Sequence, residues 1–446
     1  MKRSMVLGVL VAPVLLLAST IPAQASSLES GSWYFDKGNV QSAHDAGYDG
    51  DGVTIAVIDG PVNPDAPGLE GADLEVRDSY CYDSAGEKIP ATSTDFATAS
   101  HATNVVSMIL GTGESVPGGQ PIHGVAPATR VLHYAALVPK SLGSAATTEG
   151  ECLQENGEMV GSERPYTGLG KAISDAVDDG ADIISVSLSG FVEAADEVAK
   201  AHAAGVVVVA AMENDGGIAR FPAAYNGVVA VQAFDANGDI GTSTLSSDAA
   251  EATPNLSDDV IVAAPGIGLL VQGTANSWAE QRLVSGTSLA TPIVAGFLAV
   301  VKQKYPETTA GQLIDTLIRN TGGDPDHEPV WGNDMGYGAV SLTAMLSIDP
   351  TSYPDVNPIF DAEDPSAIPS ARNVADAAAE LQTTPVPTPS DPPAGASPGE
   401  VSPVLPWVVG GVGVIVLTAG VVVAMLLLAR RSRRNENKEM GAGHDR

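Results

Sequence analysis

Short apolar runs alternate with helical patterns from about Gly52 to Leu346, and this alternation constrains the fold more than any other feature. The apolar runs read GVTIAVID, TRVLHYAAL, ADIISVSLS, GVVVVAAM, GVVAVQAF and DVIVAAPG. Between them, GLGKAISDAVDDG and AADEVAKAHAAG have helical spacing and end near a glycine, as helices often do. Strands that alternate with helices build a mainly parallel sheet covered by helices, so we predict an α/β fold for this region.

The N-terminus reads as a targeting segment rather than as globular structure. Lys2 and Arg3 precede a long apolar stretch and then Ala23-Gln24-Ala25. This order of charged, apolar and small residues is typical of a secretory signal peptide, which we assign to residues 1–25. Residues 26–48 are left as an N-terminal extension ahead of one large domain at residues 49–348.

The C-terminal region contains an uncharged apolar segment from Trp407 to Ala429. It is long enough to cross about 30 Å of hydrocarbon, so we predict a transmembrane helix at residues 404–429. A basic tail, residues 430–446, follows with Arg430, Arg431, Arg433 and Arg434. Because basic residues favour the cytoplasmic side, the tail is expected inside the cell and the large domain outside it.

Residues 349–403 are assigned to a Pro-rich linker between the large domain and the predicted helix. The stretch from Thr383 to Pro403 is rich in proline and small polar residues and has little apolar surface to bury. The whole chain has a formal net charge of −32, from 54 acidic and 22 basic residues. This charge argues against a nucleic-acid partner and is typical of a soluble acidic domain.

Cys81 and Cys152 are the only cysteines in the sequence. An extracellular location favours a disulfide between them over two free thiols. No zinc-type pairing of cysteine and histidine is present, and the acidic loops match no calcium-ligand spacing, so we predict neither a metal site nor a cofactor.

Polar residues stand where three of the apolar patterns end or begin. Asp59 closes VTIAVID, Asn214 closes GVVVVAAMEN, and Ser288 lies where glycine and small residues give way to a long apolar helix. In parallel sheets, functional groups gather beyond the carboxyl ends of strands. Each residue also has a structural interpretation: Asp59 and Asn214 as turn residues, and Ser288 as a helix N-cap.

His101 lies in SHATNVVSM, at what reads as the start of a short helix. Alone, it is either a catalytic base or a polar residue at a helix start. Together with Asp59, Ser288 and Asn214, however, it completes a set that acyl transfer needs: a nucleophile, a base, a carboxylate that orients the base, and a donor for the oxyanion. The chain order Asp, His, Ser matches the subtilisin order and differs from the chymotrypsin and α/β-hydrolase orders.

The sequence resembles the subtilisin-like (subtilase) serine protease family from about Asp49 to Leu346. TIAVIDG is similar to the aspartate block, GVAPATRVL to the strand after the histidine helix, and SVSLSG to the segment that pairs with substrate. VVVVAAMENDGG resembles the oxyanion asparagine block, and SGTSLATPIVAG resembles the serine block, the most specific of them. The fold that this resemblance implies is subtilisin-like.

The resemblance also implies roles for individual residues. Ser288 would be the nucleophile, His101 the general base and then acid, and Asp59 the residue that orients His101. The amide of Asn214, with the backbone N–H of Ser288, would hold the oxyanion. Pro292 is expected in the first turn of the serine helix, where its missing N–H breaks no internal bond.

Substrate would bind as an added strand along the backbone of one segment of the domain. That segment consists of Ser187, Leu188, Ser189 and Gly190.

Two departures from the family pattern concern the neighbours of these residues. Ala102, Thr103 and Asn104 follow His101, where the family usually continues glycine, threonine, histidine. Glu213 stands where the family usually has glycine before the oxyanion asparagine, in a stretch expected to wall the S1 pocket. Its carboxylate either favours a basic or small polar substrate side chain or points to solvent.

The order of segments resembles that of mycosins, the membrane-anchored subtilases of actinobacterial type VII secretion systems. The resemblance implies a single-pass cell-membrane endopeptidase, with its peptidase domain outside, that cuts secreted or envelope proteins and has the secretion membrane complex as a partner. Two alternatives stay open: a protease-like scaffold that stabilises a secretion complex, and a general surface protease. The other histidines are interpreted as structural or exposed; they are His44, His123, His133, His202, His327 and His444.

Overall fold

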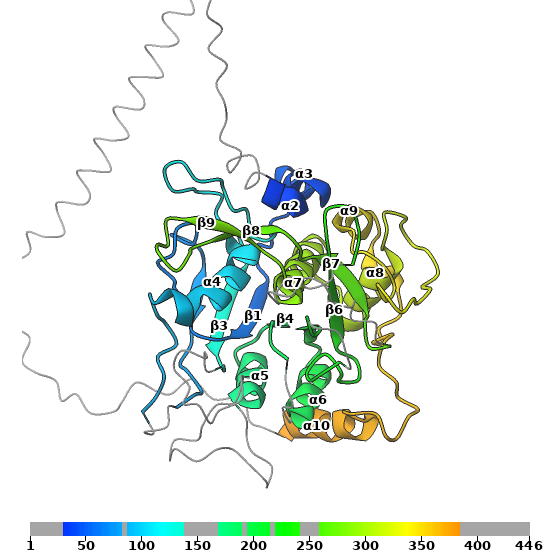
Figure 1. Cartoon of the computed structure of the whole chain (residues 1–446). Coiled ribbons are helices and arrows are strands. Elements are labelled where there is room, and N and C mark those ends of the chain that lie inside the picture. Colours follow the sequence, from blue (N-terminus) through cyan, green and yellow to red (C-terminus); the bar gives the residue numbers. More distant parts are fainter. Residues whose placement is uncertain are drawn as a thin grey trace, which may run out of the picture. The chain divides into compact units, whose positions relative to one another are not determined.

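The computed structural model describes residues 30–82, 87–137, 168–189, 194–214, 219–240 and 258–383. A seven-stranded sheet forms its centre, with strand order β2-β3-β1-β4-β5-β6-β7 and parallel pairing throughout (Figure 1). The strands are β1 (Thr54–Asp59), β2 (Leu74–Val76), β3 (Arg130–Ala135), β4 (Ile183–Val186), β5 (Val207–Ala211), β6 (Val229–Phe234) and β7 (Val262–Pro265).

The predicted apolar runs supply six of these seven strands, so the mainly parallel α/β fold is confirmed for the described residues. Every residue of β4 and β5 is buried, which explains why their sequences are continuously apolar and do not alternate. β2 was not predicted, because a strand of three half-buried residues at the sheet edge is too short to show an alternating pattern. A separate antiparallel hairpin, β8 (Leu269–Gln272) and β9 (Gln281–Val284), was not predicted either.

Helices cover both faces of the sheet. α4 (Phe96–Leu110) and α7 (Thr287–Lys304) share one apolar core with the sheet face that carries Val57 and Val209. α5 (Gly168–Asp178) and α6 (Ala195–Ala203) pack against the opposite face and share a second core with it. The sheet is therefore buried on both sides, as a parallel sheet requires.

The remaining described helices are short or peripheral. They are η1 (Ser30–Ser32), α2 (Trp33–Lys37), α3 (Val40–Asp45), α8 (Ala310–Arg319), α9 (Leu342–Leu346), η2 (Pro350–Ser352) and α10 (Ala371–Thr383).

The N-terminal extension is part of the main core from residue 30 onward. Trp33, Tyr34 and Phe35 are buried, and together they join the core that contains α4 and α7. The indole of Trp33 donates to the carbonyl of Ile267 at 3.1 Å, and the hydroxyl of Tyr34 donates to the carbonyl of His123. These aromatic side chains fix the extension to the domain.

The folded region also reaches further toward the C-terminus than the sequence predicted. Residues 349–383, assigned to the linker, form η2, a set of turns and α10, which packs against α6. Asn226 fastens this segment: its side-chain amide donates to the carbonyls of Asp361 and Pro369, and its Oδ1 accepts from the N–H of Asp361 at 2.7 Å. Up to Thr383, residues assigned to the linker are therefore part of the folded unit, because the hydrogen bonds of the Asn226 side chain and the packing of α10 against α6 order a segment whose composition is polar.

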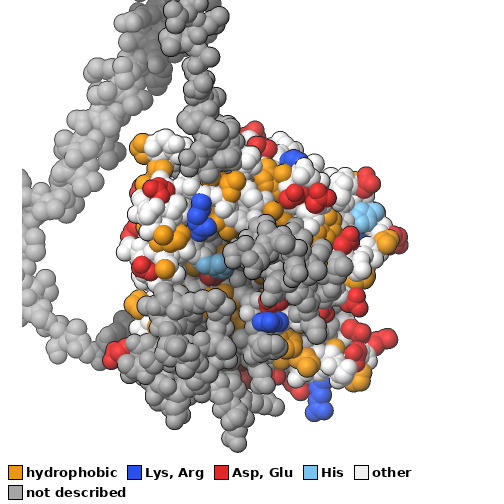
Figure 2. Space-filling model, in the orientation of Figure 1, with side chains coloured by type: hydrophobic (Ala, Val, Ile, Leu, Met, Phe, Trp, Pro, Cys, Tyr) orange, Lys and Arg blue, Asp and Glu red, His pale blue; other side chains and the backbone are white. Residues whose placement is uncertain are grey.

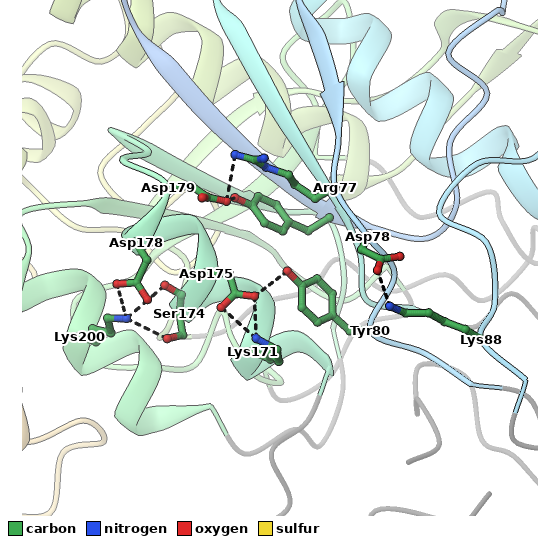
Figure 3. Close-up of polar contacts among 11 residues, drawn as sticks. Arg77, Asp78, Tyr80, Lys88, Lys171, Ser174, Asp175, Asp178, Asp179 and Lys200 are labelled. Atoms are coloured by element: carbon green, nitrogen blue, oxygen red, sulfur yellow. Dashed lines mark hydrogen bonds and ion pairs between the residues drawn. The ribbon is translucent and has the colours of Figure 1, made fainter. Parts of the chain in front are cut away.

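A polar cluster ties α5 to the edge of the sheet (Figure 3). Asp175 accepts hydrogen bonds from the hydroxyl of Tyr80 and from Lys171, both at 2.8 Å. One turn further on, Asp179 accepts from the hydroxyl of Tyr134 at 2.7 Å and pairs with Arg77 at 3.2 Å. Both carboxylates are partly exposed, so these bonds join α5 and the residue after it to the sheet edge at the surface of the domain.

Several predicted features lie outside the described residues. They are the signal peptide, residues 1–25; the spanning segment, residues 404–429; the basic tail, residues 430–446; Gly190; and Cys152. Among the helices that are described, none has the length and apolar character needed to cross a membrane. Cys81 is buried against Ile89, and its pairing with Cys152 stays a prediction.

The described part of the face shown in Figure 2 carries acidic side chains at many places, whereas basic side chains stand singly. This distribution agrees with the excess of acidic over basic residues in the sequence.

Candidate active site

Asp59 is the last residue of β1 and is fully buried. Its Oδ1 accepts two hydrogen bonds, from the N–H of Gly60 at 2.7 Å and from Nδ1 of His101 at 2.8 Å. Burial of an ionised carboxylate is costly unless it is paired, and these two donors provide the pairing. The interpretation of Asp59 as a mere turn residue does not account for the bond to His101.

His101 lies in the second turn of α4 and not at its start. The helix begins at Phe96, because Asp95 caps it: Oδ1 of Asp95 accepts from the N–H of Thr98 at 2.9 Å. The expectation that His101 opens the helix was therefore wrong. Ala102 and Asn104 are buried beside it, and Ala102 suits the helical backbone there, which needs no glycine.

The pair of Asp59 and His101 defines the proton chemistry of the imidazole. A carboxylate only accepts, so Nδ1 of His101 carries the proton and Nε2 of the neutral ring is left as a base. Desolvation of the ring disfavours imidazolium, but the charge of Asp59 and its hydrogen bond outweigh this and raise the pKa of His101 above its usual value. The side chain of His101 is 49% exposed, whereas that of Asp59 is fully buried, so the base faces outward from its carboxylate.

Ser288 is the second residue of α7, so it lies near the start of the long apolar helix that the sequence predicted, but it is not the N-cap. Gly286 is the N-cap. A Cβ built on Gly286 would lie 3.2 Å from Oγ of Ser288, 3.6 Å from Oδ1 of Asn214 and 3.8 Å from its Nδ2. The glycine thus keeps open the space that the serine hydroxyl and the asparagine amide share.

Asn214 follows β5 and is oriented by Thr287. Its Oδ1 accepts from the N–H of Thr287 at 2.9 Å and from the hydroxyl of Thr287 at 3.2 Å. The backbone N–H can only donate, so these bonds fix which end of the amide is oxygen and turn the NH₂ donor away from Thr287. This role of Thr287 was not predicted, although Thr287 stands directly before Ser288 in the distinctive segment SGTSLATP.

Ser187 follows β4 and is buried, and its hydroxyl donates to the backbone carbonyl of Ser288 at 2.8 Å. The side chain of Ser187 therefore holds the backbone of α7 at Ser288. Leu188 is half-buried and Ser189 is exposed. The binding of extended substrate along this backbone stays a prediction.

Pro292 lies in the second turn of α7, not in the first as the sequence suggested. An N–H at residue 292 would bond to the carbonyl of Ser288, so the proline removes an internal helix bond there. The hydroxyl of Ser187 occupies that carbonyl instead.

Glu213 does not point to solvent. Its side chain is 13% exposed, and Oε1 lies 3.6 Å from Nε of Arg220. Of the two sequence interpretations, the solvent-facing one is therefore wrong. The neighbouring guanidinium also offsets part of the negative charge that a basic substrate side chain would meet.

The strand order of the sheet explains why Asp59, Ser187 and Asn214 lie along one edge. β1, β4 and β5 are neighbours in the sheet, so their carboxyl ends carry Asp59, Ser187 and Asn214 along one edge. In the first turn of α7, the carbonyl of Ser288 accepts a hydrogen bond from Ser187, and the N–H of Thr287 donates one to Asn214. Among the described residues, no group of three or more His, Cys, Asp or Glu side chains is placed to hold a metal ion.

Residues 50–338 match the sequence profile of the subtilase family. The thermostable alkaline protease of Halalkalibacterium halodurans is 27% identical over 298 residues, covering 65% of this chain and 68% of the relative. Subtilisin DY of Bacillus licheniformis is 30% identical over 282 residues, covering 61% of this chain and 84% of the relative.

Among solved structures, the MycP3 protease from the type VII (ESX-3) secretion system is similar with a TM-score of 0.52 and 22% identity. The match covers 72% of this chain and 89% of that chain. At this level of identity the likeness concerns the fold.

Proposed function

The chain belongs to the subtilase family and is a subtilisin-like serine endopeptidase, and we propose that it cuts secreted or envelope proteins outside the cell while anchored in the cell membrane. We assign catalysis to Asp59, His101 and Ser288. The observation that carries this assignment is the 2.8 Å bond between buried Asp59 and outward-facing His101, at the sheet edge over which the first turn of α7 presents Ser288.

Each residue has a defined part in the proposed reaction. Nε2 of His101 takes the proton of the Ser288 hydroxyl as Oγ attacks the scissile carbonyl, and it then gives that proton to the leaving amine. Asp59 holds the tautomer of His101 and stabilises the imidazolium. The NH₂ group of Asn214 and the N–H of Ser288 donate to the oxyanion, and water then releases the acyl group from Ser288.

The anchoring and the link to secretion rest on the sequence. A signal peptide, a Pro-rich stretch after Thr383, an apolar segment at residues 404–429 and a basic tail together predict a domain tethered outside the membrane. MycP3 is a protease from a type VII secretion system, and its fold is similar to that of this chain. We propose a type VII secretion complex as the partner of this protein as well.

Covalent labelling tests the catalytic proposal. A fluorophosphonate probe should label the purified full chain at Ser288, and peptide mapping should locate the adduct there. Ser288→Ala should abolish labelling, whereas Ser352→Ala, at an exposed serine outside the assigned site, should retain it. Labelling that persists in Ser288→Ala, or that never occurs in folded protein, would overturn the assignment.

Complementation tests the secretion proposal. In a strain that lacks the gene, the wild-type chain should restore secretion through the type VII system and the processing of its substrates. Rescue of secretion by Ser288→Ala, with loss of cleavage, would show that the chain also acts as a scaffold. Broad peptide hydrolysis without any effect on secretion would instead identify a general surface protease and reject the secretion role.

A further inference from the structure

A second histidine, His133, lies behind the catalytic carboxylate. It is on β3 and is fully buried. Its strand register places it opposite Val57 of β1, and Ala135 opposite Asp59, so His133 and Asp59 belong to the same face of the sheet. The catalytic steps described above make no use of this residue.

His133 reaches Asp59 through Gly60. Nε2 of His133 donates to the carbonyl of Gly60 at 2.8 Å, and the N–H of Gly60 donates to Oδ1 of Asp59 at 2.7 Å. Among the described residues Oδ2 of Asp59 has no hydrogen-bond partner. The orientation of the carboxylate therefore depends on the two bonds to Oδ1, from Gly60 and from His101.

The imidazole of His133 acts as a neutral hydrogen-bond donor to the carbonyl of Gly60. A carbonyl oxygen only accepts, so Nε2 of His133 carries the proton. Desolvation lowers the pKa of His133, against smaller opposing effects of Asp59 and of the bond to Gly60. Asp59 on β1 is the charged group that acts on His133 from a neighbouring element, and the same carboxylate acts on His101 of α4.

A simple core-filling role does not account for this arrangement. An aliphatic side chain of similar volume would fill the same position without burying polar ring nitrogens, one of which, Nδ1, has no partner among the described residues. The imidazole of His133 therefore has an unfavourable desolvation energy, but its Nε2 holds the carbonyl of Gly60 next to the catalytic carboxylate.

We propose that His133 is a positioning residue of the active site: it fixes the Asp59-Gly60 turn and thereby orients Asp59 toward His101. This inference rests on the proposed catalytic roles of Asp59 and His101. It assigns to a buried strand residue a part in setting the basicity of His101.

Two substitutions at one position separate orientation from packing. His133→Leu fills the space but removes the donor, whereas His133→Gln retains a donor that can reach the carbonyl of Gly60. For His133→Leu we expect kcat to fall roughly tenfold to hundredfold, with KM changed less than about twofold, because the reacting groups lose alignment. His133→Gln should recover most of that loss.

The pKa of His101, measured by NMR titration in the Ser288→Ala background, gives a readout that does not depend on turnover. It should fall by about half a unit or more in His133→Leu, because a misoriented Asp59 stabilises imidazolium less, and should stay near the wild-type value in His133→Gln. His202→Leu is the matched control: Nε2 of His202 donates to the carbonyl of Asn226 at 3.0 Å, and its helix, α6, packs against the sheet face opposite α4 and α7. It should lower thermal stability without changing kcat or the pKa of His101.

An unchanged kcat and an unchanged His101 pKa in a folded His133→Leu variant would overturn the inference. If the wild-type chain hydrolyses no peptide but His133→Leu still lowers the pKa of His101, the proposed catalysis is contradicted and the positioning role is supported. The two proposals can thus fail separately.

Discussion

The hydroxyl of Ser187 donates a 2.8 Å hydrogen bond to the backbone carbonyl of Ser288. Pro292, four residues further along α7, has no N–H to offer that carbonyl. The loop after β4 and the helix that presents the nucleophile are joined at this point. The proline opens the first turns of α7 to a side chain from the sheet edge.

Replacement of Ser187 by alanine should therefore destabilise the protein. The carbonyl of Ser288 would lose its side-chain donor, at a cost of about 1–3 kcal/mol in the free energy of unfolding. Urea denaturation followed by fluorescence measures this change. Ser189→Ala, two residues on and exposed, should have no comparable effect; equal losses in both variants would contradict the role given to Ser187.

Replacement of Asn214 by alanine should lower kcat by about a hundredfold to a thousandfold and leave KM nearly unchanged, because an oxyanion donor acts in the transition state. Thr287→Val should produce a smaller loss of the same kind, since the backbone N–H of Thr287 still holds Oδ1 of Asn214. Steady-state kinetics on a chromogenic peptide measure both. Asn237→Ala, at an exposed turn, serves as the control, and a rise in KM without loss of kcat for Asn214→Ala would exclude the oxyanion role.

The activity should depend on pH through His101, which acts as a base only when neutral. Because Asp59 raises the pKa of His101, kcat/KM should fall as the pH drops through a value above the usual one of about 6.5. Asp59→Asn should lower kcat by roughly ten-thousandfold and move the acidic limb of the pH profile, where kcat/KM falls, to lower pH. A pH profile of kcat/KM from about pH 5 to 9 tests this; an unchanged limb in Asp59→Asn would show that another group controls it.

Arg220 should influence which substrates the protease prefers. The resemblance places Glu213 on the wall of the S1 pocket, and Arg220 lies 3.6 Å from its carboxylate. In Arg220→Gln, peptides with lysine at P1 should gain about two- to fivefold in kcat/KM relative to leucine peptides, a modest change because the guanidinium is partly exposed. Adding Glu213→Gln should cancel the gain, and a gain that survives in this double variant would reject Glu213 as its source.

Thermal stability should decrease below about pH 6.5, the usual pKa of an unfolded histidine. Desolvation lowers the pKa of His133, His202 and His123 in the folded state. The unfolded chain therefore binds more protons as the pH falls from about 6.5 toward these lowered values, and stability is lost across that window. His101 has a raised pKa and contributes the opposite slope, with stability lost as the pH rises through its folded value.

Melting temperatures measured at half-unit steps from about pH 5 to 8 test this expectation. His202→Gln should flatten part of the acid slope without affecting catalysis, because it removes one of the three groups. A flat profile in the wild-type chain would contradict the assigned directions.

The sequence alone determined the parallel α/β fold and the identity of the candidate catalytic residues. The buried strands are continuously apolar, and Asp59, His101, Asn214 and Ser288 stand in distinctive blocks, so both signals are local and readable along the chain. The start of α4 was misplaced because the capping role of Asp95 depends on a hydrogen bond, and aspartate is common in turns as well.

Only the tertiary structure decided the contacts that support the site. Thr287 orients Asn214, Ser187 occupies the carbonyl that Pro292 leaves open, Arg220 neighbours Glu213, and His133 holds Gly60 beside Asp59. The first, second and fourth of these pairs join residues more than 70 positions apart. Strand order and register bring them together, and no pattern along the sequence encodes either one.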